Sequence, residues 1–444
     1  MHDLRKQVLL ESGKTQSKKA RSKVGTPASS KATSPVPSRG GSRVPSRNVS
    51  DDESELSDGT QWGTNSIDEL LANDADPDAA PDALIADLRE RIEQICDRKR
   101  SSAEGRELSL NAFTHDLMRH YSKPELQHRI DELLPAVLKS VKAGQTERET
   151  VLALKAIALM LVTVPSDTIY DAVSGPIKNT ITDGEASHPS AKIAALHTLS
   201  IATFYGGAST EETEEVMDFF LEIISSDASN IEETDNADLV TAALQEWGFL
   251  ATQLEDMEEI TEVAMDAFVD QLESSDAGVQ MAAGENIALL FEKSYTEAES
   301  DDDEPEEEEE EHRHDGPRKI KRYTAYRQQH LLERQLEDIT RGSSKRVSKK
   351  DRKALHQAFE DVLRTVEKPT RGPRYSTALD EDGREYGSRL RIAVHGGGRM
   401  TIDAWWKLQR LNGLKRLLQG GFLVHYEFNE VVFESLPVIV EDDE

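Results

Sequence analysis

The chain has 444 residues and a net charge of −31, from 84 acidic and 53 basic side chains. This charge excludes a protein that coats nucleic acid with its whole surface, because phosphates attract cations. The single cysteine, Cys96, excludes an internal disulfide framework and fits a reducing compartment. No apolar run approaches the roughly 18 residues of a membrane-spanning helix, and the N-terminus lacks the apolar core of a signal peptide. We expect two or three domains. The protein is expected in the cytoplasm and nucleus.

Residues 1–80 are predicted to be a disordered tail. They are rich in Ser, Pro, Gly and charged residues, and bury too little apolar surface to offset the loss of chain entropy. The tail is basic over residues 1–50, and an acidic stretch begins at Asp51. The lysines and arginine of residues 18–23 are a candidate nuclear localisation signal, and the alternative is a solvated, phosphorylatable tail.

From Pro81 onward, apolar residues recur at three- and four-residue steps, which is typical of helices. After two initial helices come helix pairs whose second members are rich in Ala and Leu and begin near residues 147, 191, 239 and 279. Steps of roughly 40 to 48 residues are the period of armadillo and HEAT repeats. We therefore predict one armadillo-like helical repeat domain over residues 81–295. The predicted helices cover residues 81–95, 107–121, 126–141, 147–164, 168–181, 191–204, 212–224, 239–254, 260–272 and 279–291.

An acidic run separates this domain from a basic segment. Residues 297–311 are almost continuously acidic and end in six consecutive glutamates. Like charges repel and stay solvated, so residues 296–316 are predicted to be a disordered acidic linker. Residues 317–368 follow as a basic connector, in which we predict helices from Tyr323 to Ile339 and from Ser348 to Val366.

Residues 374–444 are predicted to form a small C-terminal module. It begins with a β-hairpin, because the sequence alternates from Arg389 to Val394 and returns at Met400 to Ile402 after a glycine-rich turn. Two helices are predicted after the hairpin, over residues 403–418 and 429–436. The predicted fold class is mostly α: an armadillo/HEAT-like α-solenoid with a small C-terminal α/β module, a disordered tail and a disordered linker.

Three segments carry a resemblance to a known family. They are the alanine- and leucine-rich part of residues 133–164, the string Ser348 to Lys353 with its continuation to Glu367, and residues 401–421. In these segments the chain resembles the interferon-related developmental regulator family, of fungal type, over about residues 85–440. The lysine-rich string at 348–353 is the most specific of them. The long acidic run and the glycines at 396–398 depart from the animal pattern.

The resemblance implies an armadillo-like fold and no enzymatic activity. It also implies one of two roles. In the first, the protein binds ribosomes that are not translating and occupies functional sites on them. In the second, it is a transcriptional co-regulator that acts through protein partners.

The basic connector is the main candidate for binding ribosomal RNA. Lysine and arginine contact phosphates and release counterions, and Tyr323 and Tyr326 are suited to stacking on exposed bases. Two alternatives remain open: the acidic run folds back and neutralises the connector, or the connector is a nuclear import signal. The candidate phosphate-binding residues are Arg318, Lys319, Lys321, Arg322, Arg327, Lys345, Arg346, Lys349, Lys350, Arg352 and Lys353.

Trp405, Trp406, Lys407 and Arg410 combine aromatic and basic character on the predicted helix 403–418. Neighbouring helix positions diverge by about 100°, so one tryptophan is expected in the core and the other is available for stacking or a partner contact.

No catalytic motif accompanies these residues. His312 and His314 have no cysteine pair nearby, which disfavours zinc. The string His395 to Gly398 lacks an accompanying Gly-x-Ser-x-Gly elbow, so a hairpin turn is the better interpretation. No Walker loop or dinucleotide fingerprint is present. We predict no enzyme, no metal, no cofactor, no small-molecule substrate and no membrane partner.

The predicted function is that of a non-enzymatic, ribosome-binding translational regulator. It contacts rRNA through the basic connector and the C-terminal module, and it occludes functional sites on inactive ribosomes. The alternative is a transcriptional co-regulator, a protein-binding armadillo-like scaffold whose solenoid surface holds protein partners.

Overall fold

The computed structural model describes residues 81–98, 101–184, 187–298, 319–341, 349–379, 383–394, 398–436 and 440–442, which all lie in one compact unit, Leu56–Glu444. The predicted tail and most of the predicted acidic linker lie outside the described residues, as do Arg318, Lys345, Arg346 and the glycine-rich turn at 395–397. None of the helices in the described ranges is long and apolar enough to cross a membrane.

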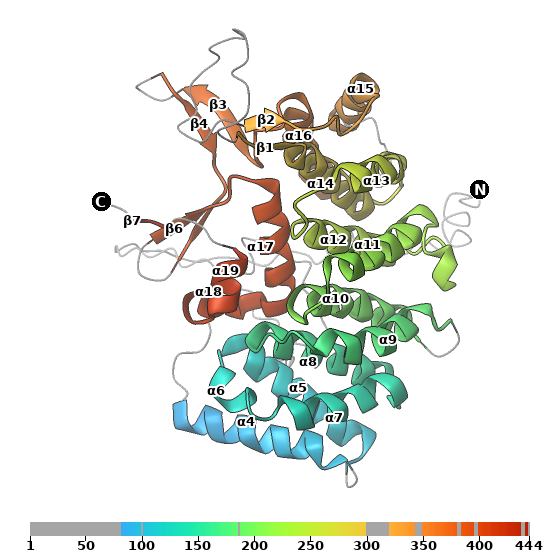
Figure 1. Ribbon diagram of the computed structural model, residues 1–444, viewed down its shortest axis with the longest axis vertical. Helices are drawn as coiled ribbons and strands as arrows, with labels where there is room; N and C mark the ends of the chain where they lie inside the picture. Colours follow the sequence, from blue (N-terminus) through green and yellow to red (C-terminus); the bar gives the residue numbers. More distant parts are fainter. Residues whose placement is uncertain are drawn as a thin grey trace, which may run out of the picture. The chain divides into compact units, whose positions relative to one another are not determined.

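Helices packed in pairs make up most of the described chain. In each pair the second helix also packs against the second helices of the neighbouring pairs, so α5, α8, α10, α12, α14 and α16 form one continuous row (Figure 1). This arrangement confirms the predicted fold class, a helical solenoid with a small strand module. The pairs are α4 (Pro81–Cys96) with α5 (Ala103–Arg119), α7 (Ile130–Ala143) with α8 (Glu147–Thr163), α9 (Ile169–Thr182) with α10 (Pro189–Tyr205), α11 (Thr210–Ser225) with α12 (Ala237–Ala251), α13 (Glu258–Gln271) with α14 (Ala277–Lys293), and α15 (Gln329–Thr340) with α16 (Lys349–Glu367).

Local signals begin the second helices close to where the sequence predicted them. The side chain of Thr146 accepts the N–H of Glu149 at 3.1 Å and caps α8. Pro189 occupies the first turn of α10. Asn236 and Asp276 cap α12 and α14 in the same way as Thr146 caps α8. The starts at residues 147, 189, 237 and 277 thus confirm the repeat period.

The second helices are buried on nearly every side. In α8 every residue from Val151 to Thr163 is buried, and that stretch includes Lys155. The first helix of each pair covers one side of the row, and the C-terminal segment covers another. Within that segment α17 crosses the row and packs against α5, α8, α12 and α14 (Figure 1). The segment consists of α17 (Trp405–Leu418), η3 (Gln419–Gly421), α18 (Phe422–Phe428) and α19 (Glu430–Ser435).

Short antiparallel strands complete the fold. The predicted hairpin is present as β5 (Arg391–Ala393) and β6 (Gly398–Thr401), and β7 (Val440–Asp442) joins the free side of β6. A second hairpin, β3 (Tyr375–Leu379) with β4 (Glu385–Ser388), was not predicted. Pairing of β1 (Tyr295–Glu297) with β2 (Lys319–Lys321) brings the two ends of the acidic linker together.

The helix predicted from Tyr323 begins later than expected. α15 starts at Gln329, because residues 319–321 pair as β2 with β1. The residues between the end of β2 and the start of α15 run along α13. The Tyr323 hydroxyl lies 3.4 Å from Thr261 Oγ1, and Arg327 forms an ion pair with Glu262 at 3.0 Å. Packing of this stretch on α13 therefore overrides its helical spacing.

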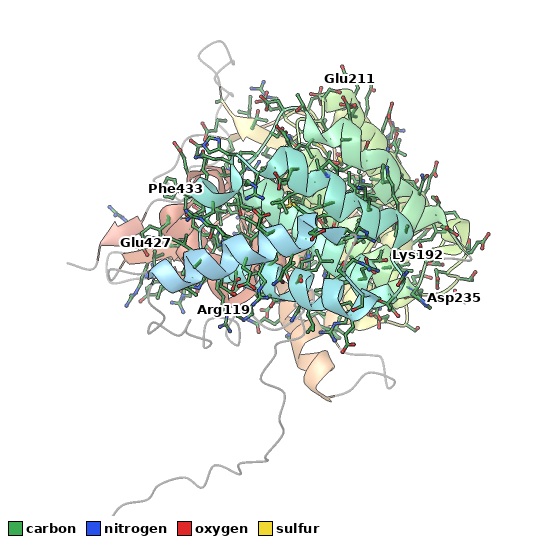
Figure 2. The ribbon with its side chains drawn as sticks, turned by 90° about the horizontal axis from the view of Figure 1, so that it is seen from below. Arg119, Lys192, Glu211, Asp235, Glu427 and Phe433 are labelled. Carbon is green, nitrogen blue, oxygen red and sulfur yellow. The ribbon has the colours of Figure 1, made fainter. Side chains whose placement is uncertain are left out.

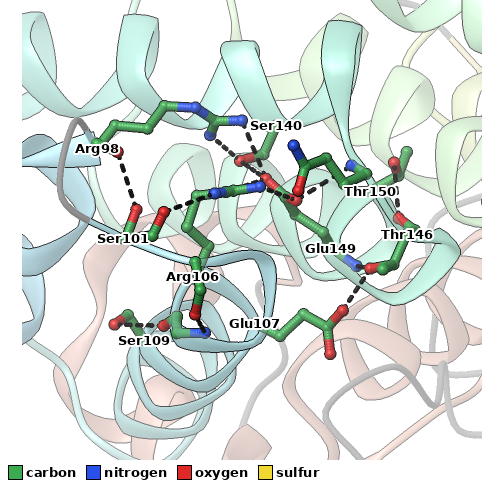
Figure 3. A network of polar contacts seen from close by, with 12 residues as sticks. Arg98, Ser101, Arg106, Glu107, Ser109, Ser140, Thr146, Glu149 and Thr150 are labelled. Carbon is green, nitrogen blue, oxygen red and sulfur yellow. Dashed lines mark hydrogen bonds and ion pairs between the residues drawn. The ribbon is translucent and has the colours of Figure 1, made fainter.

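A buried carboxylate joins the first two helix pairs (Figure 3). Glu149 accepts hydrogen bonds from Arg98 at 3.0 Å, from Arg106 at 2.7 and 2.8 Å, and from Ser140 at 2.7 Å. Burial alone would raise the pKa of Glu149, but hydrogen bonds from Arg106, Ser140 and the Gln145 N–H outweigh it and lower the pKa to about 2.

Replacing Glu149 with glutamine should lower the free energy of unfolding by about 2 kcal/mol near pH 7, because two arginines lose their charged acceptor. The folded pKa lies below the ordinary value of 4.5, so the stabilisation is present above that pH and is lost as the pH falls toward 2. Urea unfolding across this window should therefore show the two proteins converging. The exposed Glu211 (Figure 2) is the control; it lies in the first turn of α11, so Glu211→Gln should lower the free energy of unfolding by no more than about 0.5 kcal/mol. A pH-independent difference would contradict the assignment.

Candidate RNA-binding surface

The structure divides the predicted basic connector into separate places. Lys319 and Lys321 are exposed on β2, with the half-buried Ile320 between them. The basic residues Lys349, Lys350, Arg352 and Lys353 open α16, and their side chains lie outside the described residues. At 1.5 Å per residue, the start of α16 is roughly 27 Å from its end. Lys319 and Lys321 lie near the start of α17, beside the end of α16. The basic residues that open α16 lie at its other end.

A carboxylate from α14 caps the start of α17. The local N-cap residue, Ala404, has no side chain that could accept a hydrogen bond. Glu292 accepts the N–H of Trp405 at 2.7 Å with one oxygen and the N–H of Trp406 at 3.0 Å with the other. Burial raises the pKa of Glu292, while these two donors and the charge of Lys319 oppose the rise. Lys319 is therefore close enough to act on the carboxylate that holds α17.

Two of the four residues selected on this helix serve the fold. Trp405 is 2% exposed, and its indole N–H donates to Thr365 Oγ1 at 2.8 Å, so it has no face for a base. Arg410 donates to the carbonyls of Thr252 at 3.0 Å and Ser435 at 2.8 Å. It joins α12 to the end of α19.

The other two residues are half-exposed and interact with each other. Trp406 lies between cations: the guanidinium of Arg410 is 5.1 Å from its ring centroid and Lys407 Nζ is 5.6 Å away. Lys407 also lies 2.6 Å from Asp403. Trp406 and Lys407 therefore stay the better candidates for an external contact on α17.

The connector tyrosines pack inward. Tyr323 and Tyr326 are half-buried against the core, and burial raises the pKa of both. Arg322 donates to Thr296 Oγ1 at 2.6 Å, across the β1–β2 pair. These three residues have a role in holding the connector against the solenoid, whatever else they contact.

The strand module carries basic residues that the sequence patterns had not indicated. Arginine occurs six times between residues 371 and 399, and this recurrence was the available signal. Arg371 is half-buried and lies 3.5 Å from Glu385. The exposed arginines of the module are Arg374, Arg384, Arg389, Arg391 and Arg399.

The two hairpins meet β2 at the start of α17. The Ser388 hydroxyl donates to the carbonyl of Ile402 at 2.7 Å, and the N–H of Ile402 donates to Leu390 at 2.8 Å. Trp405 follows three residues later and contacts Glu292 beside Lys319. We call this region the basic surface; it consists of Lys319, Lys321, Arg374, Arg389 and Arg391.

The basic surface presents cations and an aromatic ring to solvent. Its side chains are exposed cations with an aromatic neighbour, Tyr386, which is 51% exposed. Among the described residues, no three His, Cys, Asp or Glu side chains are arranged to hold a metal ion. Such a surface is suited to phosphates.

Comparison with known proteins places the chain in a family. The family model described as interferon-related developmental regulator (IFRD) matches residues 46–367, which is more than half of the chain. The chain belongs to the interferon-related developmental regulator family. It is 24% identical over 345 residues to an uncharacterised protein of Schizosaccharomyces pombe, covering 77% of this chain and 72% of that protein. It is 22% identical over 417 residues to interferon-related developmental regulator 1 of Sus scrofa and of Homo sapiens, covering 88% of this chain and 82% and 81% of those proteins.

The match to the interferon-related developmental regulator model ends at the end of α16, Glu367. All of the helix pairs named above lie within the matched range, including α15 with α16. The strand module and α17 to α19 follow that range. The C-terminal helices that cover the row of second helices, and the arginines of the hairpins, therefore lie outside the matched range.

Proposed function

We propose that this protein is a non-enzymatic translational regulator that binds ribosomes and contacts rRNA through the basic surface and the start of α16. The observation that carries the proposal is the gathering of exposed lysines and arginines around the start of α17, on a chain of net charge −31. A local positive surface on an acidic body attracts phosphates in one orientation and repels them elsewhere. The helix pairs would then occlude functional sites on inactive ribosomes by their bulk.

Because α17 to α19 cover the row of second helices, that row is not open to a partner, which supports contact through the basic surface. Solenoids commonly offer such a row to partners, but here α17 to α19 occupy it. His425 Nε2 lies 2.9 Å from the carbonyl oxygen of Leu117, and Asn429 donates to the carbonyl of Val162 at 3.0 Å. A partner that displaced the segment would leave these buried carbonyls unpaired, at a cost of about 1–3 kcal/mol each.

The alternative function is transcriptional co-regulation through protein partners, and one feature favours it. A groove of about 840 Å³ lies between the α11–α12 connection and α13, lined among others by Asp266, Asp270 and Val263, the last of which is 65% exposed. Lys192, labelled near Asp235 in Figure 2, steadies that connection by donating to the Ile231 carbonyl at 2.7 Å. An acidic and partly apolar groove suits a basic protein segment. The proposed location, cytoplasm and nucleus, accommodates both functions.

Sedimentation through a sucrose gradient tests the proposal. The native protein in cell lysate should travel with ribosomes. Two variants, Lys319→Glu/Lys321→Glu and Lys349→Glu/Lys350→Glu, should each lose about tenfold or more of the ribosome-bound fraction, because reversed charges repel phosphates. The matched control is Lys139→Glu/Lys142→Glu on the exposed side of α7, which changes the net charge equally and should sediment as the native protein does.

The outcomes separate the two functions. If the native protein stays at the top of the gradient in lysates of growing and starved cells, ribosome binding is wrong and co-regulation takes its place. If the α7 control is lost from ribosomes together with the connector variants, net charge governs binding and the assigned surface is wrong.

A further inference from the structure

We propose that the two β-hairpins of the strand module bind an unpaired RNA strand, with a base stacked on the Tyr386–Arg389 pair and phosphates held by Arg374 and Arg391. This inference rests on the proposed function and deepens it, because it names the form of RNA and the residues that recognise it.

The fold turns Tyr386 outward. Its neighbour Glu385 faces the other way, where its carboxylate accepts the Tyr375 hydroxyl at 2.8 Å and lies 3.5 Å from Arg371. The strand register shifts at this point, and Gly387 has a φ of +67°, which glycine adopts without strain. Such bulges re-aim a side chain. Tyr386 is left 51% exposed, although burial of its ring would have contributed to the core.

A guanidinium already lies over the ring of this tyrosine. Arg389 Cζ lies 4.4 Å from the ring centroid of Tyr386. The ring and the guanidinium are both exposed, and the arginine adds positive charge to the pair. Unpaired bases stack on aromatic rings and on guanidinium planes, so the pair is a platform that a base would extend.

Two more arginines flank the platform. The N–H of Arg389 donates to the carbonyl of Arg374 at 3.2 Å, so these residues are neighbours across the hairpin. Arg391 follows two residues after Arg389; both arginines are exposed, and Leu390 between them is buried. Arg374 has a left-handed backbone with φ +52°, and its N–H is bonded to the carboxylate of Asp361.

Arg389 and Arg391 carry charge that no carboxylate pairs with in the described chain, while the charge of Arg374 acts on the nearby carboxylate of Asp361. Within the described ranges, none of Arg374, Arg389 and Arg391 forms an ion pair with a carboxylate, whereas Arg371 and Lys407 close by do. A stacking platform with exposed arginines beside it matches the alternation of base and phosphate along a single strand.

The stacking platform would distinguish unpaired RNA from other anionic ligands. A duplex presents phosphates and 2′-hydroxyls but keeps its bases stacked inside, so it gains nothing from Tyr386. An acidic protein segment would use the arginines and leave the tyrosine ring without a partner. The ring of Tyr386 is therefore the group whose removal distinguishes these ligands.

Fluorescence anisotropy with the full-length protein tests the inference. The probes are a labelled oligouridylate of about 12 nucleotides, chosen from the usual site sizes, an RNA duplex of equal length, and polyglutamate. The native protein should bind the oligouridylate most tightly. Tyr386→Ala should weaken that binding about tenfold, and Tyr386→Phe should preserve it, since stacking needs only the ring. Arg374→Gln/Arg391→Gln should lower the slope of log affinity against log salt by about 0.7 for each lost phosphate contact.

A second exposed ring serves as the control. Phe428 on α18 is 60% exposed and lies outside the basic surface, so Phe428→Ala should bind the oligouridylate as the native protein does. The inference is overturned if Tyr386→Ala binds like the native protein, or if the duplex or polyglutamate binds as tightly as the oligouridylate.

Sedimentation of the same variants keeps the two proposals apart. If the native protein travels with ribosomes and Tyr386→Ala keeps its affinity for the oligouridylate, only the role of the hairpins is overturned. If the native protein binds the oligouridylate through Tyr386 but never travels with ribosomes, only the proposed function is overturned. Because Tyr386 is largely exposed, Tyr386→Ala should keep the native melting temperature.

Discussion

Replacing Arg416 with methionine should lower the free energy of unfolding by about 3–5 kcal/mol, because it leaves a buried carboxylate without its cation. Arg416 on α17 donates to Glu246 on α12, and the two side chains are 8% and 3% exposed. His197 Nδ1 on α10 lies 2.7 Å from the same carboxylate oxygen. These contacts fasten α17 across the row of second helices.

The loss should depend on pH in a defined direction. Burial would raise the pKa of Glu246, but the charge of Arg416 and the hydrogen bond from His197 outweigh it and lower the pKa to about 2, from the ordinary 4.5. The native carboxylate thus stabilises the fold above that ordinary value and loses the effect as the pH falls toward 2. Without Arg416 the pKa of Glu246 rises. Protonation of Glu246 in mild acid then removes the unpaired charge. The loss of unfolding free energy in Arg416→Met should therefore be largest near neutral pH and smaller in mild acid.

Urea unfolding of the native protein, Arg416→Met and the double variant Arg416→Met/Glu246→Gln checks this. The double variant should recover part of the loss, because the uncompensated charge is gone. Lys139→Met, on the exposed side of α7, is the matched control and should unfold as the native protein does. A loss in Arg416→Met no larger than in this control would mean that α17 is not held by the buried pair.

Local patterns were sufficient for the repeats. The starts of α8, α10, α12 and α14 depend on caps and a proline within each segment, so the sequence alone predicted them. The start of α15 depends on β2 pairing with β1 and on packing against α13, and helical spacing cannot show either. α18 was missed for the same kind of reason, because its contact with Leu117 lies far away along the chain. The β3–β4 hairpin pairs locally, but its register shift interrupts the alternation that would have indicated it.

The docking of α17 had an indirect signal in the sequence. The run Leu152 to Leu159 contains one polar residue, Lys155, so α8 has no side suited to water. A helix that is apolar all round is covered all round. The composition thus indicated a cover for the row, but not its identity, since contacts such as His425 with Leu117 span most of the chain.

The candidate site was only partly predictable. The recurrence of lysine and arginine indicated residues 317–368, and Lys319 and Lys321 of that segment lie in the basic surface. The exposure of Tyr386 depends on a register shift beside Gly387, and the nearness of Arg374 to Arg389 depends on strand pairing. Tertiary contacts also turned Trp405 and Arg410 inward, which periodicity on one helix cannot determine.

Replacing Gly421 with alanine should destabilise the protein by about 3 kcal/mol, because η3 approaches α5 without room for a methyl group. An added Cβ at Gly421 would lie 1.8 Å from the carbonyl oxygen of Met118 and 2.7 Å from its carbon. These are backbone atoms at the end of a helix, so neither can turn aside as a flexible side chain would. To relieve the clash, η3 and α18 must move away from α5.

That movement would also strain other contacts of the segment. α18 begins at Phe422, and its His425 contacts the Leu117 carbonyl one residue from the clash. Hydrogen exchange should therefore quicken first in α18 and at the end of α5, beyond the change in global stability measured by urea. The matched control is Gly175→Ala in α9, where an added Cβ meets nothing within 4 Å; it should gain up to about 1 kcal/mol from helix propensity. Equal exchange in α18 of the native protein and Gly421→Ala would show that the segment is not pinned at this point, and that the cover over the row of second helices depends on α17 alone.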